Sequence, residues 1–252
     1  MANIIYGRNT VMEALKSGRE IEKLLLLKNG EGSIKKIEAI ARDRRIPIQY
    51  VEKVVLDKVT MVQGGPASHQ GVAASASSYR YYELEDMLSA AAAKGEDPLL
   101  VLLDGIEDPH NLGAIIRTAD GAGVHGIIIP KRRAAGLTDT AAKASAGAVE
   151  YVPVAKVSNL VQTIEKLKLA GLWIAACDMD GQIYHKTPMT GPLALVIGNE
   201  GQGISRLVRE KCDFIVSIPM EGRISSLNAS NAAAILLYEI HRQRKGKSSG
   251  KL

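Results

Sequence analysis

An apolar run passes into a glycine-rich turn in the segment Leu193-Ala-Leu-Val-Ile-Gly-Asn-Glu-Gly-Gln-Gly-Ile-Ser205. The run 193–197 contains no polar residue, which is typical of a strand buried on both faces of a parallel sheet. Glycines after such a strand let the backbone approach a ligand closely. Neither the dinucleotide fingerprint G-x-G-x-x-G nor the phosphate-binding GK[ST] loop is present, and Glu200 would repel a polyphosphate. The segment therefore predicts a site for a ligand with positive charge, or else a plain strand–helix turn.

Five further apolar runs of strand length alternate with helical segments on either side of this one. They are Leu99–Asp104, Gly126–Ile129, Tyr151–Val154, Leu172–Ala176 and Phe214–Ile218. This alternation predicts an α/β domain with a parallel sheet that helices cover on both faces. The last helix is expected over 227–242, and the basic segment 242–252 after it is expected to be disordered.

The first part of the chain predicts a separate, smaller α/β sandwich over residues 1–78. Its expected elements are a helix ending at Lys16, a strand over Ile21–Lys28, a helix begun by Ser33, and strands over Ile46–Val51 and Gly71–Ala76. Residues 79–98 are acidic and alanine-rich, and they are interpreted as a solvated helical linker. The expected domains are therefore 1–78 and 99–252.

The charge distribution suits a polyanionic partner such as RNA. The 252 residues carry a net charge of +5, with an isoelectric point near 9.1. Residues 1–78 carry 12 basic and 8 acidic side chains, and residues 101–252 carry 18 and 14, whereas residues 79–100 carry 2 and 5. Both large blocks are therefore basic, as nucleic-acid-binding proteins often are.

Other features narrow the class of protein. No apolar run approaches the length of a membrane span, and the first ten residues lack the pattern of an export signal. Cys177 and Cys212 form no C-x-x-C pair, which argues against a disulfide scaffold or a zinc site. We therefore expect a cytoplasmic protein with no membrane and no metal, in which both cysteines are small buried side chains.

Two more segments carry polar side chains at the ends of predicted strands. In Asp104–Ala119, Asn111 is expected to cap a helix, and Arg117 interrupts an otherwise apolar helical pattern. A charge near an apolar face is costly unless it is paired, so Arg117 is a candidate site residue. In Ile218–Ser230, three polar residues crowd the start of the last helix, where one cap would suffice. Since carboxyl ends of parallel strands share one edge of a sheet, all three loops are expected to meet there.

The three loops together resemble the motifs of the SpoU family of RNA methyltransferases. The matching elements, in chain order, are the N…G…R element Asn111, Gly113 and Arg117, the GNEGxG element 198–203, and the IPM…SLNxS element 218–230. The match covers about 150 residues. The first block, beginning Tyr6-Gly-Arg-Asn-Thr-Val-Met-Glu-Ala-Leu15, resembles the substrate-binding domain of the same family.

This resemblance implies a fold and partners that no periodicity indicates. It implies a C-terminal α/β domain of the SPOUT type with a deep trefoil knot, a rare exception to unknotted topology. It also implies a small N-terminal domain with a ribosomal-protein-like α/β fold, and a homodimer. The implied reaction transfers a methyl group from S-adenosyl-L-methionine to a ribose 2'-hydroxyl, of a guanosine in 23S rRNA.

The resemblance also assigns residues to roles. Cofactor contacts fall to Gly198, Ile218, Met220, Leu227 and Asn228, and catalytic roles fall to Asn111, Arg117 and Glu200. The resemblance makes Arg117 the base that activates the hydroxyl, but a guanidinium is a poor proton acceptor. The alternative role of Arg117 is to hold the adjoining phosphate and stabilise alkoxide charge, while Asn111 and Glu200 orient Arg117 and the nucleotide. The proton then leaves to Glu200, phosphate or water. The alternatives are a tRNA ribose target and a non-catalytic RNA-binding protein; intact catalytic residues argue against the second.

Overall fold

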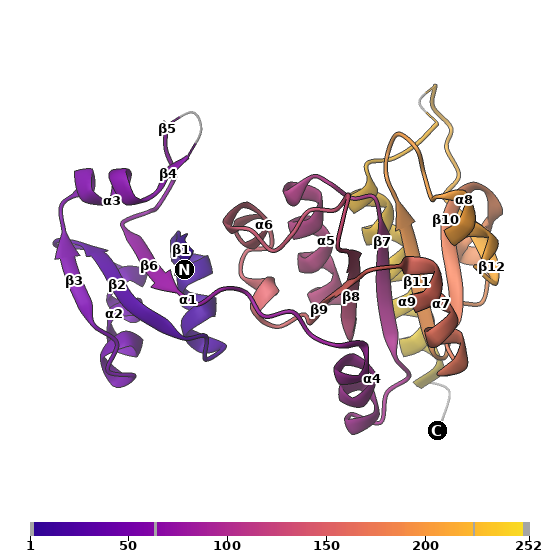
Figure 1. The fold of residues 1–252 in the computed structure, drawn as a ribbon, viewed down its shortest axis with the longest axis horizontal. Coiled ribbons are helices and arrows are strands. Elements are labelled where there is room, and N and C mark those ends of the chain that lie inside the picture. Colours follow the sequence, from indigo (N-terminus) through magenta and orange to yellow (C-terminus); the bar gives the residue numbers. More distant parts are fainter. Residues whose placement is uncertain (1–2, 63–64, 224, 249–252) are drawn as a thin grey trace. The chain divides into compact units, whose positions relative to one another are not determined.

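The computed structural model describes residues 3–62, 65–223 and 225–248, and its contacts divide the chain into two compact units (Figure 1). Unit 1 comprises Met1–Arg80 together with Leu137–Tyr151. Unit 2 comprises Tyr81–Gly136 and Val152–Leu252. The chain therefore passes between the units three times. Two consecutive domains, as the sequence predicted, would be joined by a single passage.

Unit 1 is built on a four-stranded sheet with the strand order β1-β6-β2-β3. Strand β6 is antiparallel to both of its neighbours, and β2 and β3 are parallel. The elements are β1 Asn3–Tyr6, α1 Arg8–Lys16, β2 Ile21–Leu27, α2 Ser33–Asp43, β3 Ile48–Val51, α3 Lys53–Val59, the short pair β4 Met61–Val62 and β5 Gly65–Pro66, and β6 Val72–Ala76. The predicted small α/β sandwich is thus present, although Gly7 and Gly32 precede the first two helices without a side-chain cap.

The segment 137–151 folds onto unit 1 through a buried ion pair. It contains α6 Asp139–Ala144 and the 3-10 turn η1 Ala148–Glu150. Arg19 Nη1 lies 2.9 Å from Glu150 Oε1, and the two side chains are only 6% and 7% exposed. The same guanidinium stacks on the Tyr79 ring at 3.7 Å, and burial raises the pKa of Tyr79 to about 12. Because a buried charge needs its partner, Glu150 is part of the core of unit 1.

Unit 2 is a six-stranded parallel sheet with the order β12-β10-β11-β7-β8-β9. Its elements are α4 Leu84–Ala93, β7 Leu99–Asp104, α5 Pro109–Ala122, β8 Gly126–Pro130, β9 Val154–Val157, α7 Leu160–Leu169, β10 Trp173–Ile183, η2 Tyr184–Lys186, β11 Leu193–Gly198, α8 Arg206–Glu210, β12 Phe214–Ser217 and α9 Ala229–Ser248. The predicted parallel α/β sheet is confirmed.

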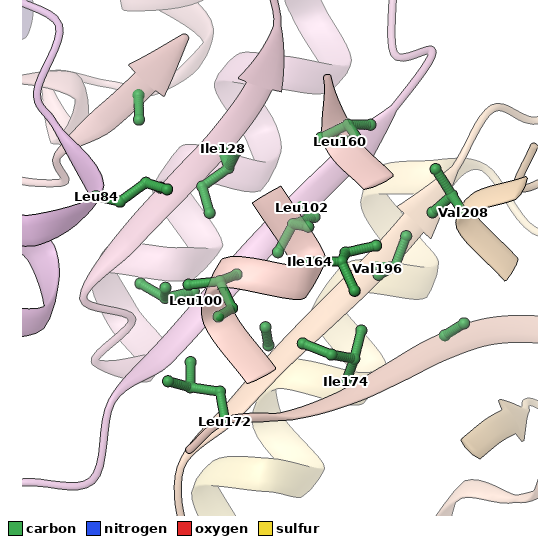
Figure 2. Packing of buried hydrophobic residues seen from close by; sticks show 14 of the residues in the cluster. Leu84, Leu100, Leu102, Ile128, Leu160, Ile164, Leu172, Ile174, Val196 and Val208 are labelled. Carbon is green, nitrogen blue, oxygen red and sulfur yellow. The ribbon is translucent and has the colours of Figure 1, made fainter. Parts of the chain in front are cut away.

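Alternate residues of each strand face different helix layers. Leu100, Leu102 and Val196 point toward α7, where they meet Leu160 and Ile164 in a continuous apolar cluster (Figure 2). The intervening strand residues are equally buried, because α5 and α9 pack together and α9 packs on β11. Burial on both faces explains why these strands are apolar throughout.

Helix α4 does not behave as a solvated linker. Met87 is fully buried and belongs, with Leu84, to the apolar cluster of unit 2 (Figure 2 labels Leu84). Met87 also fills the space above Gly126, where any Cβ atom would collide with its side chain. The acidic residues and most of the alanines lie on the outer face of this helix, whereas Ala91 is buried. Residues 81–98 are part of unit 2.

Three other predictions differ from the structure at element ends. The strand expected over 151–154 begins only at Val154, because Tyr151 still belongs to unit 1 as the C-cap of η1. Strand β10 runs to Ile183 through a polar stretch, with a shift in register against β12 between Cys177 and Gln182. Helix α9 continues to Ser248, so the prediction of disorder is wrong for residues 242–248. Residues 249–252 lie outside the described residues.

Buried His125 makes the stability of unit 2 sensitive to acid. Its Nδ1 accepts a hydrogen bond from the Leu99 amide at 3.0 Å, and its Nε2 lies 3.1 Å from Glu96 Oε2. The ring therefore binds as the neutral tautomer. Burial lowers the pKa of His125 below its ordinary 6.5, helped by Lys94 and Arg244 and opposed by Glu96. Below pH 6.5 the unfolded chain then binds more protons than the folded one.

We therefore expect His125 to make its whole contribution to the free energy of unfolding above pH 6.5. This contribution should decrease as the pH falls from 6.5 toward the lower pKa of the folded state. Trp173, the single tryptophan, lies in β10 and reports urea unfolding of unit 2 by fluorescence. The variant His125→Gln should lack this component of the pH dependence. Identical pH profiles for the parent protein and the variant would contradict the assignment.

Candidate functional site

The three polar loops follow β7, β11 and β12, and they meet at the carboxyl edge of the sheet in unit 2. Between the second and third of them lies a pocket of about 310 Å³. Its lining residues are Cys177, Asp178, Met179, Ile197, Gly198, Asn199, Glu200, Gly201, Gln202, Gly203, Ile218, Met220, Ser225, Ser226, Leu227, Ala229 and Ala232. The middle of β10, at residues 177–179, supplies one wall, which the sequence did not indicate.

Glu200 joins the three loops through a single carboxylate oxygen. Its Oε1 accepts hydrogen bonds from Asn111 Nδ2 at 2.7 Å, from Asn228 Nδ2 at 2.7 Å and from the Ala229 amide at 3.2 Å. Asn228 Nδ2 also donates to Asn111 Oδ1 at 3.0 Å. One residue from each loop thus takes part in a closed network. Hydrogen bonds to a carboxylate are stronger than neutral ones, so this network fixes the loops relative to one another.

The network explains why polar residues crowd the start of α9. Asn228 is the cap of that helix, since its Oδ1 accepts from the Ser230 amide at 2.9 Å. Glu200, from another loop, accepts from the preceding amide of Ala229, and its negative charge is favourable at a helix N-terminus. Asn111, expected to be an N-cap, instead lies in the first turn of α5, where Asp108 caps the helix by accepting from the His110 amide.

Two residues that the sequence analysis missed hold the loops in place. Asn199 Nδ2 donates to the Gly105 carbonyl at 2.9 Å, while its Oδ1 accepts from the Gly201 amide at 2.8 Å. Asp104 Oδ2 accepts from the Ser205 amide at 2.8 Å. Both lie at strand ends next to predicted site residues, and that position is the signal that could have found them.

Gly198 is required for a reason other than the one expected. A Cβ atom at this position would lie 2.5 Å from the Gly203 carbonyl oxygen and from the Ile204 amide nitrogen. The turn closes on itself here through a bridge between Asn199 and Gly203. The glycine therefore accommodates the protein's own backbone, and the shape of the pocket depends on that close approach.

Arg117 stands apart from the network. Its side chain is exposed on α5, between buried positions such as Ile116 and Ala119, so the expected burial cost does not arise. Within the described residues it makes no hydrogen bond or ion pair, and neither Asn111 nor Glu200 orients it. The structure thus brings Asn111, Glu200 and Asn228 together and leaves Arg117 open to solvent.

The pocket combines apolar walls with negative charge. Four of the five predicted cofactor contacts line it, namely Gly198, Ile218, Met220 and Leu227, while Asn228 lies beside it in the hydrogen-bond network. Asp178 and Glu200 are its acidic lining residues. Burial, with Asp178 adding to it, raises the pKa of Cys177 to about 11, so the thiol stays protonated at neutral pH.

The described residues contain no group of three or more His, Cys, Asp or Glu side chains that could hold a metal ion. In the same ranges, no helix is both long enough and apolar enough to cross a membrane.

Fold and site define an α/β protein with a ligand pocket beyond the carboxyl ends of a parallel sheet. The model of the SpoU rRNA methylase family matches residues 98–238, and the model for RNA 2'-O ribose methyltransferase substrate binding matches residues 4–82. The chain therefore belongs to the SpoU family of RNA methyltransferases. A Bacillus subtilis relative, YacO, named for the TrmH family of tRNA/rRNA methyltransferases, is 49% identical over 242 residues, which are 95% of each chain.

Two solved structures extend the comparison. An AdoMet-bound rRNA methyltransferase from Sinorhizobium meliloti is similar with a TM-score of 0.79 and 27% identity, over 96% of this chain and 87% of that chain. A TrmH/SpoU tRNA-modifying enzyme of A. aeolicus is similar with a TM-score of 0.56 and 34% identity, over 61% of this chain and 78% of that chain.

Proposed function

We propose that this chain transfers a methyl group from S-adenosylmethionine to the 2'-hydroxyl of a guanosine ribose in 23S rRNA. The observation that carries this proposal is the network of Asn111, Glu200 and Asn228 beside the pocket. The network joins the three family motifs into one site beside the pocket. A protein that only binds RNA would not need such a site.

The lining residues fit S-adenosylmethionine. The volume of about 310 Å³ lies within the range of small-molecule sites, and Ile197, Ile218 and Leu227 offer apolar surface to a nucleoside. Asp178 and Glu200 suit a ligand with a positively charged sulfonium and ammonium group, whereas they would repel a phosphate. When bound, S-adenosylmethionine supplies an activated methyl group, so the chain's own residues have to align the ribose and stabilise charge.

Arg117 is the residue we assign to the ribose. Its exposed guanidinium has five donors and no partner among the described residues, so it is available to an RNA phosphate and to the developing alkoxide. Asn111 and Glu200 act as positioning residues, since their hydrogen bonds hold the start of α5 and the start of α9 in a fixed position relative to each other. The 2'-hydroxyl proton leaves to Glu200, to phosphate or to water.

An rRNA target is favoured by the extent of the structural likeness. The relative described as an rRNA methyltransferase is similar over nearly the whole chain, whereas the tRNA-modifying relative is similar over 61% of it. Unit 1 is accordingly proposed to bind the rRNA substrate, and the guanosine rests on the family resemblance. The enzyme would act in the cytoplasm.

The direct test is to map ribose 2'-O-methylation in RNA from cells that lack this protein. One guanosine of 23S rRNA should lose its modification, and the purified protein with S-adenosylmethionine should restore it. Calorimetry should detect cofactor binding with the same affinity when a strong chelator is present. A full set of modifications in the deleted strain, or loss of binding in the chelator, would refute the corresponding part of the proposal.

The trefoil knot and the homodimer implied by the resemblance also stay predictions. The alanine-rich stripe of α9 is used inside the chain, because Ala233, Leu236 and Leu237 are buried. The outer face of α9 instead carries Tyr238, which is 53% exposed, and exposed aromatic side chains are enriched at interfaces. We expect a dimer in sedimentation at micromolar concentration. A monomer there, or an unchanged dimer after Tyr238→Glu, would show that this face is not the interface.

A further inference from the structure

A run of three cations, Lys131, Arg132 and Arg133, follows β8 at the same edge of the sheet as the candidate site. All three side chains are exposed, and within the described residues none of them makes an ion pair or a hydrogen bond. Arg133 adopts a positive φ of 54°, which is uncommon for a residue other than glycine. Backbone strain of this kind is found in segments that the surrounding structure holds in a defined shape.

The surrounding hydrogen bonds show how this basic loop is held. The Lys131 amide donates to the Val157 carbonyl at 2.8 Å, and the Ala135 amide donates to the Ile106 carbonyl at 2.8 Å. The second bond reaches the loop after β7, directly beside Gly105, whose carbonyl accepts from Asn199. The basic loop and the glycine-rich loop are thus fixed to two adjacent residues, Gly105 and Ile106.

The strand order gives the spacing. Strand β8 lies two positions from β11, with β7 between them, so the loops that follow β8 and β11 are about 10 Å apart at the sheet edge. This separation places the basic loop beside the reacting site but outside the pocket, whose lining residues do not include it.

Electrostatics then indicate the partner. The pocket carries Asp178 and Glu200, and the loop after β7 carries Glu107 and Asp108, so these parts of the edge repel a polyanion. An RNA strand that brings its ribose to the site must have its phosphates neutralised nearby. Unpaired arginines and lysines on a fixed loop provide that charge.

We propose that Lys131, Arg132 and Arg133 bind backbone phosphates of the RNA strand that flanks the reacting ribose. This inference rests on the proposed function for the identity of the substrate, and it assigns to unit 2 an RNA-binding surface of its own, separate from the one proposed for unit 1. Because phosphate contacts carry no sequence information, the loop adds affinity and orientation while leaving the choice of nucleotide unchanged.

The test compares two full-length double variants that each remove two positive charges. The first is Arg132→Gln with Arg133→Gln. The matched control is Lys94→Gln with Lys166→Gln, two exposed lysines at the ends of α4 and α7. Binding to a fluorescent hairpin RNA is measured without S-adenosylmethionine over a range of salt concentrations. The slope of log affinity against log salt should shrink by about 0.7 for each phosphate that is no longer neutralised, so by roughly 1.4 for the first variant.

The control variant should keep the parent slope. The double variant Arg132→Lys with Arg133→Lys keeps both positive charges, so it should keep the parent slope as well. Equal slopes for the parent and the first variant, or equal decreases in the two double variants, would overturn the proposal. Trp173 fluorescence confirms that each variant is folded. Since RNA binding is read directly, an absence of methyl transfer in the parent would refute the proposed function without changing this result.

Discussion

Replacing Arg117 with alanine is expected to slow methyl transfer by on the order of 10²- to 10³-fold, the usual cost of removing one preorganised donor from a site of developing charge. Affinity for S-adenosylmethionine should stay within about twofold of the parent value, because Arg117 is not among the residues that line the pocket. Single-turnover transfer to rRNA gives the first quantity and calorimetry gives the second.

Two controls make the Arg117 result specific. Lys166→Ala removes another exposed cation, from α7, and should leave the rate unchanged. Arg117→Lys keeps the charge but loses the planar fork of donors, so it should fall between the parent and the alanine variant. If Arg117→Ala turned over within a few-fold of the parent rate, Arg117 would not be an active-site residue.

Gly198→Ala is expected to weaken S-adenosylmethionine binding by on the order of 10- to 100-fold. The added methyl group would collide with the backbone at Gly203 and Ile204, which cannot give way as a flexible side chain would. The turn must open to accept it, and overpacking of this kind costs about 1–3 kcal/mol, which corresponds to that loss of affinity.

Gly201→Ala is the matched control for this variant. It lies in the same turn and also lines the pocket, but its added Cβ atom would approach only the Asn199 side chain, at 3.4 Å. Binding of S-adenosylmethionine should therefore stay within a few-fold of the parent. Equal reductions of affinity in the two variants, measured by calorimetry, would show that the close approach at Gly198 does not shape the pocket.

Local patterns predict the sheet of unit 2 well, because strands buried on both faces must be apolar throughout. The runs at β7, β8, β11 and β12 therefore coincide with their predicted positions to within one residue. Strand β10 extends further than predicted, since its second half pairs with β12 through main-chain groups that polar side chains do not prevent. Main-chain pairing of this kind has no hydrophobic signature.

Contacts between distant segments are what the patterns could not show. The position of Glu150 in unit 1 depends on Arg19, which lies 131 residues earlier in the chain. The partners of Glu200 lie 89 and 28 residues away, so the spacing of its motif could indicate a site but not the network that forms it. Arg117 was singled out by an apolar pattern around it, whereas the structure places it on the solvent face of α5.

The return of residues 137–151 to unit 1 constrains the order in which the chain can fold during its synthesis. Domains generally fold as units from the N-terminus as they leave the ribosome. Residues 1–80 emerge first, but Arg19 has no carboxylate partner until Glu150 has been made. Burying a guanidinium without its carboxylate partner strongly destabilises the folded state. Unit 1 therefore reaches its final stability only after β7 and β8, the first two strands of the larger sheet to be synthesised, have left the ribosome.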